Sequence, residues 1–214
     1  MLCKRVVVLL TLSHGRLVRT KRFRIDRWYS LEAFSFRGAD EICVIDVTPG
    51  GADRVATATT VERVVSEAFV PVTLGGGLRT LEDARWAFGC GADKLLSSSI
   101  EFCEAVADDY GEQAVVWGAT FAPDFPPDHP RLCGEVLLQS VVRDGSLMGY
   151  DPFMPDPVNR PLVVGSGCGS WRHMLDAFEA GADACATSNV LHFSETALAS
   201  CKKYLGDHGI KVRP

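Results

Sequence analysis

The chain has 214 residues, 47% of them hydrophobic, and a formal net charge of −5. This size fits one hydrophobic core and a single domain spanning residues 1–214, and the charge argues against nucleic acid or anionic membranes as partners. Eight cysteines form no CxxC pair and five histidines show no HxH or HxxxH spacing, so the sequence predicts buried reduced thiols, no metal site and no cofactor.

The first apolar run, Val6–Leu12, follows Lys4 and Arg5 and has the shape of a signal peptide's start. A strongly basic stretch follows the run, however, and no small-x-small cleavage site is present. A buried first strand explains the run better, and no other segment approaches transmembrane length. We therefore expect a cytoplasmic protein.

Short β-branched apolar runs alternate with helical patterns along the chain, as parallel sheets require. Eight strands are predicted, at residues 5–11, 41–47, 70–75, 93–97, 113–119, 135–141, 161–165 and 183–187. Helices are predicted at residues 29–37, 58–68, 80–90, 100–109, 170–180 and 194–206. This alternation predicts an α/β fold, a (β/α)8 TIM barrel.

Two consecutive connections depart from the regular pattern. The proline-rich segments 123–130 and 151–157 are unsuited to a full helix, so shortened crossovers are expected after strands 5 and 6. Strand surface would then lack its covering helix, and a partner subunit or self-association would cover it. An open doubly wound sheet is the alternative architecture.

The chain also resembles itself at an offset of 90 residues. Residues 70–77 align without a gap with residues 160–167, and Ser98 then falls on Ser188. Each copy reads as a strand, a glycine turn, an amphipathic helix and a second strand ending in small hydroxyl residues. This half-barrel repeat favours a closed barrel. Glycine turns expose N–H groups at helix N-termini, so two phosphate sites are expected, one per half.

Motifs over nearly the whole chain carry a family likeness. They are Met1-Leu-Cys-Lys-Arg5, Gly15-Arg16, Gly38-Ala-Asp-Glu41, Ile45-Asp46, Gly75-Gly-Gly-Leu-Arg-Thr80, Glu82-Asp-Ala84, Gly91-Ala-Asp-Lys94, Arg143-Asp-Gly145, Gly149-Tyr-Asp151, Gly181-Ala-Asp183, His192-Phe193 and Gly209-Ile-Lys-Val-Arg213. In this order the motifs resemble the cyclase subunit of imidazole glycerol phosphate synthase (HisF), a lyase of histidine biosynthesis. The resemblance implies a phosphorylated small-molecule ligand and a class I glutaminase as the partner subunit.

The resemblance also implies two catalytic aspartates, at the ends of strands 1 and 5, acting as general acid and base. This chain has Thr11 and Ala119 at the positions that we align with them, and neither side chain titrates near neutral pH. Because each proton transfer contributes about 10²–10⁴-fold, losing both should cost several orders of magnitude in rate. Asp124, in the proline-rich segment, is the one candidate replacement.

Four charged residues at predicted strand starts match the family. They are Arg5, Glu41, Lys94 and Glu135. Strand starts meet at one face of a barrel, where two cations and two anions can pair in a ring. The resemblance assigns this ring the gating of ammonia from the glutaminase, which Gln113 and Asp93 would face. Solvated charges at strand edges are the alternative.

The resemblance further supplies two sets of phosphate-binding residues. The first set is Gly77, Ser98 and Ser99, and the second is Asp144, Gly145, Gly167, Ser188 and Asn189. Backbone N–H groups and hydroxyls suit a phosphate dianion, although tight turns and helix packing also select such residues.

Three further residues match the family near the substrate. Arg16 and Arg19 fall in the family's mobile first βα loop, with Arg19 in place of a functional lysine. Asp46 ends strand 2, although a carboxylate capping a turn would look the same.

Three functions remain open. The first is a paralogue that keeps the phosphosugar barrel and the ammonia passage but serves another pathway, and the missing acid–base pair favours it. The second is a genuine cyclase with atypical catalytic groups. The third is a non-catalytic scaffold. Whether the chain is an enzyme is therefore undecided at this point.

Overall fold

The structure is a computed structural model that describes residues 3–31, 38–51, 53–121, 130–152, 159–188, 190–191 and 197–213. Its strands form one sheet in the order β10-β9-β8-β7-β6-β5-β4-β1-β2-β3, and β10 also pairs with β1. The barrel wall is β1 (Arg5–Ser13), β4 (Glu41–Asp46), β5 (Val72–Gly75), β6 (Lys94–Ser97), β7 (Val115–Thr120), β8 (Glu135–Gln139), β9 (Leu162–Val164) and β10 (Ala184–Thr187). These pairings are all parallel, so the predicted TIM barrel is confirmed and the open sheet is wrong.

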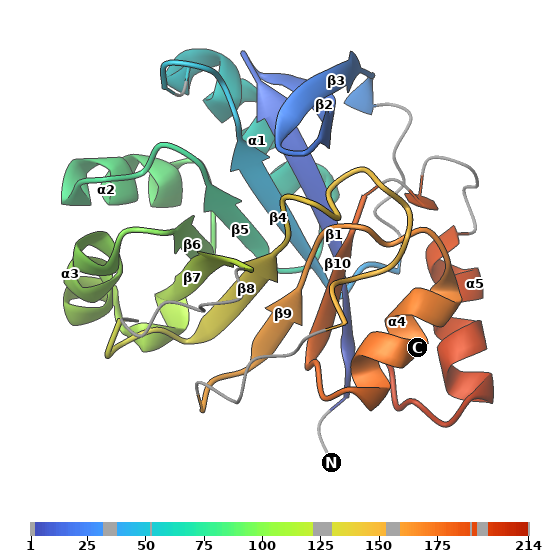
Figure 1. Cartoon of the computed structure of the whole chain (residues 1–214). Coiled ribbons are helices and arrows are strands. Elements are labelled where there is room, and N and C mark those ends of the chain that lie inside the picture. Colours follow the sequence, from blue (N-terminus) through green and yellow to red (C-terminus); the bar gives the residue numbers. More distant parts are fainter. Residues whose placement is uncertain are drawn as a thin grey trace.

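Helices surround the barrel on most sides (Figure 1). They are α1 (Arg54–Glu67), α2 (Leu81–Gly89), α3 (Ile100–Tyr110), α4 (Trp171–Glu179) and α5 (Ala197–Asp207), with a short 3₁₀ turn η2 (Glu112–Ala114). The predicted capping box is present in α2, where Thr80 and Asp83 satisfy each other's main chain. Of the predicted helix at 29–37, residues 32–37 lie outside the described part. No helix among the described residues is long and apolar enough to span a membrane.

The two shortened crossovers flank β8, a strand at the front of the barrel in Figure 1. The described residues of these connections, 121, 130–134, 140–152 and 159–161, contain no helix. The outward side chains of β8 nevertheless lie in the core, with Val136 and Leu138 only 1% and 5% exposed. The expectation that a partner must cover this strand is therefore wrong for β8, because the chain buries it.

The basic segment after β1 forms an antiparallel hairpin, and its two strands were not predicted. It consists of β2 (Arg16–Lys21) and β3 (Arg24–Trp28), and β2 pairs with the end of β1. Leu17, Val18 and Thr20 are buried between exposed basic neighbours, and these charges masked the strand pattern. Gly15 allows the hairpin's approach, since it has φ +68° and a Cβ there would clash with the main chain of Ala56.

Side chains alternate between two apolar layers along each strand. The inner layer fills the barrel and consists of Val7, Leu9, Cys43, Leu96, Val116, Leu137, Val163, Ala184 and Ala186. The outer layer joins the strands to the helices. Seven of the eight cysteines are buried and all are unpaired, which confirms that they act as small hydrophobic side chains. Burial raises the pKa of the Cys43 thiol to about 12, so it stays protonated.

Three Gly-Ala-Asp motifs fasten the floor of the barrel, the face where the strands begin. The carboxylates of Asp40, Asp93 and Asp183 each accept a main-chain N–H from a neighbouring strand segment, at 2.8–3.0 Å. Asp40 also pairs with Lys202 of α5 at 2.9 Å, and both side chains are less than 10% exposed. This buried ion pair holds the last helix against the strand starts.

Asp40→Ala should destabilise the fold by about 3–5 kcal/mol, because it leaves the buried Lys202 ammonium without its partner. Lys203→Ala, which removes an exposed pair with Asp207, should change stability by less than about 0.5 kcal/mol. Urea denaturation followed by circular dichroism measures both. Equal losses in the two variants would contradict the importance given to the buried pair.

Candidate functional site

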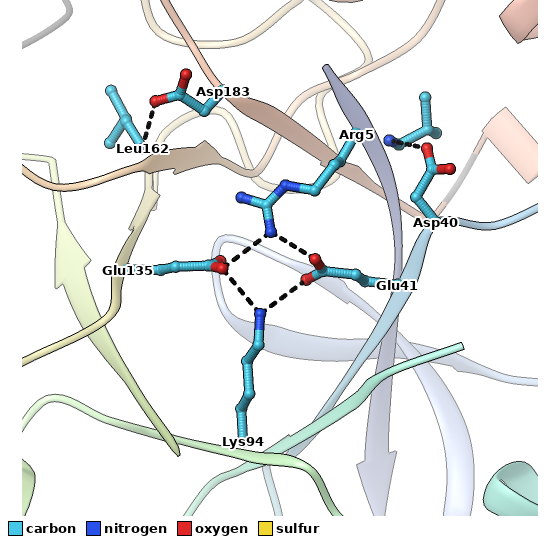
Figure 2. A network of polar contacts seen from close by, with 8 residues as sticks. Arg5, Asp40, Glu41, Lys94, Glu135, Leu162 and Asp183 are labelled. Carbon is cyan, nitrogen blue, oxygen red and sulfur yellow. Dashed lines mark hydrogen bonds and ion pairs between the residues drawn. The ribbon is translucent and has the colours of Figure 1, made fainter. Parts of the chain in front are cut away.

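The four charged residues predicted to meet at the floor form a closed ring of ion pairs (Figure 2). Arg5 Nη1 contacts Glu41, and it lies 2.9 Å from Glu135 Oε1. Lys94 Nζ completes the ring, 2.8 Å from Glu135 Oε1 and 3.4 Å from Glu41 Oε2. Cations and carboxylates therefore alternate around one point, which excludes the alternative of separate solvated charges.

The ring lies largely out of water, with side-chain exposures between 10% and 16%. Burial by itself would raise the pKa of Glu135, but the hydrogen bonds and charges of Arg5 and Lys94 outweigh it and hold that pKa below its ordinary value. Each charge is compensated by two opposite neighbours, which is the condition for burying it at acceptable cost.

A cavity of about 250 Å³ lies at the other end of the barrel, where the strands end. Its walls are Leu9, Thr11, Arg19, Thr20, Phe23, Ile45, Val47, Gln139, Asp144 and Ser188. Leu9 also belongs to the inner apolar layer, with Ile45 packed against that layer, so the packed apolar interior of the barrel lies between this cavity and the ring. Active sites of TIM barrels lie at this face.

The two positions expected to carry catalytic aspartates do not both face the cavity. Thr11 does, and its hydroxyl donates to the carbonyl of Val18 in the hairpin. Ala119 packs in the outer layer, whereas Val116 lies in the inner one. By strand alternation Thr120 is therefore the inward residue at this end of β7, paired with Gln139 of β8. The expected position was wrong by one residue, but threonine, like alanine, does not titrate near neutral pH.

Asp144 is the one carboxylate among the described residues that line the cavity. It accepts the main-chain N–H of Phe23 at 2.9 Å, and the Arg22 N–H donates to its carbonyl at 3.2 Å. Burial raises its pKa, opposed by hydrogen bonds from Phe23 and Thr20 and by the charge of Arg19. Asp144 thus holds the β2–β3 hairpin over the cavity.

The other residues expected near the substrate, Arg16, Arg19 and Asp46, do not lie together. Arg19 lines the cavity and its Nη2 lies 3.5 Å from the carbonyl of Gly145. Arg16 lies outside the cavity and stacks on Trp28, 5.1 Å from the ring centre. The carboxylate of Asp46 accepts hydrogen bonds from Thr48 in the turn after β4 and from Thr57 of α1, so the turn-capping alternative describes it.

The first set of residues predicted to bind phosphate, which we name the first cradle, is Gly77, Ser98 and Ser99. The Ser97 hydroxyl links the two turns that carry the first cradle. It donates to the Leu78 carbonyl at 3.3 Å and accepts the Ser99 N–H at 3.2 Å. The Ser99 hydroxyl caps α3 and donates to Glu101 at 2.8 Å. None of the first-cradle residues lines the cavity.

The second set, named the second cradle, is Asp144, Gly145, Gly167 and Ser188; Asn189 lies outside the described residues. Asp144 and Ser188 line the cavity, and Gly167 packs against the turn that carries Gly145, accepting Gly149 N–H at 2.8 Å. Gly167 has φ +91°, and a Cβ there would clash with the Gly149 carbonyl, so the glycine is required for this packing. The second cradle is thus continuous with the cavity.

The match to known proteins extends over the chain. Residues 4–121 match the family described as "Histidine biosynthesis protein". The chain is 32% identical over 250 residues to the imidazole glycerol phosphate synthase subunit HisF of Chlorobium phaeovibrioides, with both chains fully covered. It is 30% identical over 245 residues to the same subunit of Campylobacter concisus, with 98% of each covered. The chain belongs to the HisF family.

Within the HisF family this chain is short and divergent at the site. The alignment with the Chlorobium subunit runs over 250 positions although this chain has 214 residues, so the relative has segments that are missing here. Asp124, the candidate replacement acid, lies outside the described residues. Sequence reasoning missed Gln139 and Phe23 as cavity residues. The two-residue period from Glu135 would have revealed Gln139, but nothing local marks Phe23.

Among the described residues no group of three or more histidine, cysteine or acidic side chains is arranged to hold a metal ion. The exposed positions Gln113 and Asp93 both lie at the floor of this HisF-family barrel. Asp93 has a structural role there, accepting Val72 N–H at 2.8 Å.

Glu135→Gln should destabilise the protein at neutral pH by about 2 kcal/mol, the range for hydrogen bonds to charged groups. Because folding lowers the pKa of Glu135, its stabilising contribution is present above the ordinary glutamate value of about 4.3 and is lost as pH falls through the lowered value. Urea midpoints between pH 7 and 3.5 should therefore converge for wild type and variant. Asp207→Asn serves as the surface control, and a constant gap would contradict the ring's charge dependence.

Asp144→Ala should loosen the hairpin, because the Phe23 N–H loses its acceptor. Losing a bond worth about 1–2 kcal/mol should speed hydrogen exchange at Phe23 about tenfold or more. Asp144→Asn keeps an acceptor oxygen and should stay near wild type. Mass spectrometry of amide exchange over residues 20–24 provides the measurement, and unchanged exchange in the alanine variant would show that other contacts hold the hairpin.

Proposed function

We propose that this HisF-family barrel binds a small phosphorylated sugar derivative in its upper cavity and pairs with a class I glutaminase, whose ammonia enters through the floor. The observation that carries the proposal is the closed ring of Arg5, Glu41, Lys94 and Glu135 beneath an apolar interior that reaches the cavity. Burying four charges costs desolvation free energy even when they are paired, so their presence at the floor favours a functional role there. Eight unpaired cysteines suit the reducing cytoplasm.

The cyclisation step of the relatives is lost or altered in this proposal. The inward strand ends present Thr11 and Thr120, whose hydroxyls do not titrate near neutral pH and so cannot replace a carboxylate acid–base pair. The cavity keeps hydrogen-bonding groups and a cation, so it is suited to holding a ligand. We infer that the chain delivers ammonia to a different acceptor from that of the relatives.

A genuine cyclase with atypical catalytic groups is the second candidate, and Asp144 favours it. This carboxyl lines the cavity and burial raises its pKa toward the range of a general acid or base. The hydrogen bonds of Asp144 to the hairpin argue against a role in proton transfer, because its carboxylate oxygens already accept hydrogen bonds from Phe23 and Thr20.

The test uses the purified chain with a class I glutaminase subunit and the relatives' nucleotide substrate. We expect association with the glutaminase, stimulation of glutamine hydrolysis and no formation of imidazole glycerol phosphate. Lys94→Ala should abolish the coupling of glutamine hydrolysis to ammonia delivery, while Lys203→Ala on α5 should not. Normal cyclase turnover would overturn the proposal, and absence of any glutaminase association would favour a scaffold.

Variants that restore carboxylates at the ends of β1 and β7 make this test more specific. Thr11→Asp combined with Thr120→Asp should recover measurable cyclase activity, because both inward strand ends then carry an acid–base group. Thr11→Asp combined with Ala119→Asp should recover none, because residue 119 faces the outer layer. Equal recovery in both double variants would show that the inward assignment of Thr120 is wrong.

A further inference from the structure

One residue of the first cradle, Ser99, already contacts an exposed anion of the chain itself. The Ser99 hydroxyl donates to Glu101 Oε2 at 2.8 Å, and Glu101 stands in the first turn of α3. Its own backbone N–H and the Ser99 hydroxyl lower the pKa of Glu101, so the carboxylate is charged at neutral pH. Donors that would bind a phosphate at this helix start are therefore engaged by a carboxylate.

The internal repeat provides a comparison within the same chain. Ser98 corresponds to Ser188 at the offset of 90 residues, and by the same offset Glu101 corresponds to Leu191. Leu191 is apolar and only 8% exposed, and its N–H bonds the Ser188 carbonyl at 3.0 Å. The second half thus has no acid at the position where the first half places one.

The cavity also favours the second cradle over the first as the place where a ligand binds. Asp144 and Ser188 of the second cradle line it, while Gly77, Ser98 and Ser99 do not. Arg19 also lines it and reaches the Gly145 carbonyl, so a cation stands at the second cradle. The charge of Asp144 is offset there by the Phe23 N–H and by Arg19.

The size of the cavity points to a small ligand. Its volume of about 250 Å³ falls below the usual range of about 300–1,000 Å³ for pockets that hold drug-sized molecules. A compound with a phosphate at each end would need both cradles, which lie on opposite halves of the barrel. One phosphate on a short sugar backbone needs only the second.

We propose that the ligand of this barrel is a sugar monophosphate, whose single phosphate binds at the second cradle while Glu101 occupies the first in place of another phosphate. The inference rests on the proposed function in taking the ligand to be a phosphorylated small molecule. It adds that the first half of the repeat has become an internally neutralised site.

Phosphate stoichiometry tests this directly, with inorganic phosphate as the probe in isothermal titration calorimetry. Wild type should bind one phosphate per chain, and Glu101→Ala should bind two, because the helix N-terminus and Ser99 become available. Glu82→Gln is the matched control, since Glu82 takes the same place in the first turn of α2, and it should bind one. Ser188→Ala should remove the wild-type site.

Sugar phosphates extend the test. Ribose 5-phosphate and ribulose 1,5-bisphosphate should bind the wild type with similar affinity. Glu101→Ala should favour the bisphosphate by about tenfold, the effect of one added charge-assisted interaction. Glu101→Gln should act in the same direction, which separates the charge from the space it occupies. Circular dichroism checks that the exposed substitutions leave the fold intact.

Two outcomes would overturn the inference and are distinguishable. Two phosphates bound per wild-type chain, or one per chain in Glu101→Ala, would overturn the inference alone and leave the proposed function standing. No phosphate bound by any variant would overturn both the inference and the phosphosugar part of the proposed function. Glutaminase association is measured independently of either result.

Discussion

The pairing of β1 with both β10 and β4 is the constraint on which the rest of this molecule depends. It closes the sheet, and closure leaves alternate side chains no direction except inward. Charged residues at strand starts must then meet at the floor, where Arg5, Glu41, Lys94 and Glu135 neutralise one another. The same alternation selects Thr11 and Gln139 for the upper cavity.

Only one end of the barrel departs from what the HisF family likeness implies. The floor keeps a complete set of paired charges fastened by the Gly-Ala-Asp carboxylates. The upper end has lost titratable groups at the strand ends and has a hairpin fixed over its cavity by Asp144. The internal repeat has diverged too, with Glu101 in one half and Leu191 in the other. The ionic floor of the barrel therefore matches the family more closely than the upper end does.

Much of this architecture follows from sequence because it depends on local periodicity. The barrel strands, the capping box of α2 and the meeting of the floor charges all follow from apolar runs and their starts. The outward orientation of Ala119 did not follow from the sequence, because an alignment error of one residue moves a side chain to the opposite face of its strand. The hairpin was not predicted because basic residues at its exposed positions obscure the strand pattern. The role of Glu101 could not be predicted either, because it depends on the contact with Ser99.

Described residues near both ends of the chain also meet at the floor. Lys4 N–H donates to the Lys211 carbonyl at 2.8 Å, and Lys4 pairs with Val212 in a parallel bridge. Any segment fused to either end therefore emerges beside the face that carries the ionic ring. An affinity tag at one terminus would be expected to obstruct that face as much as one at the other, so an internal or cleavable tag is the appropriate choice for interaction studies.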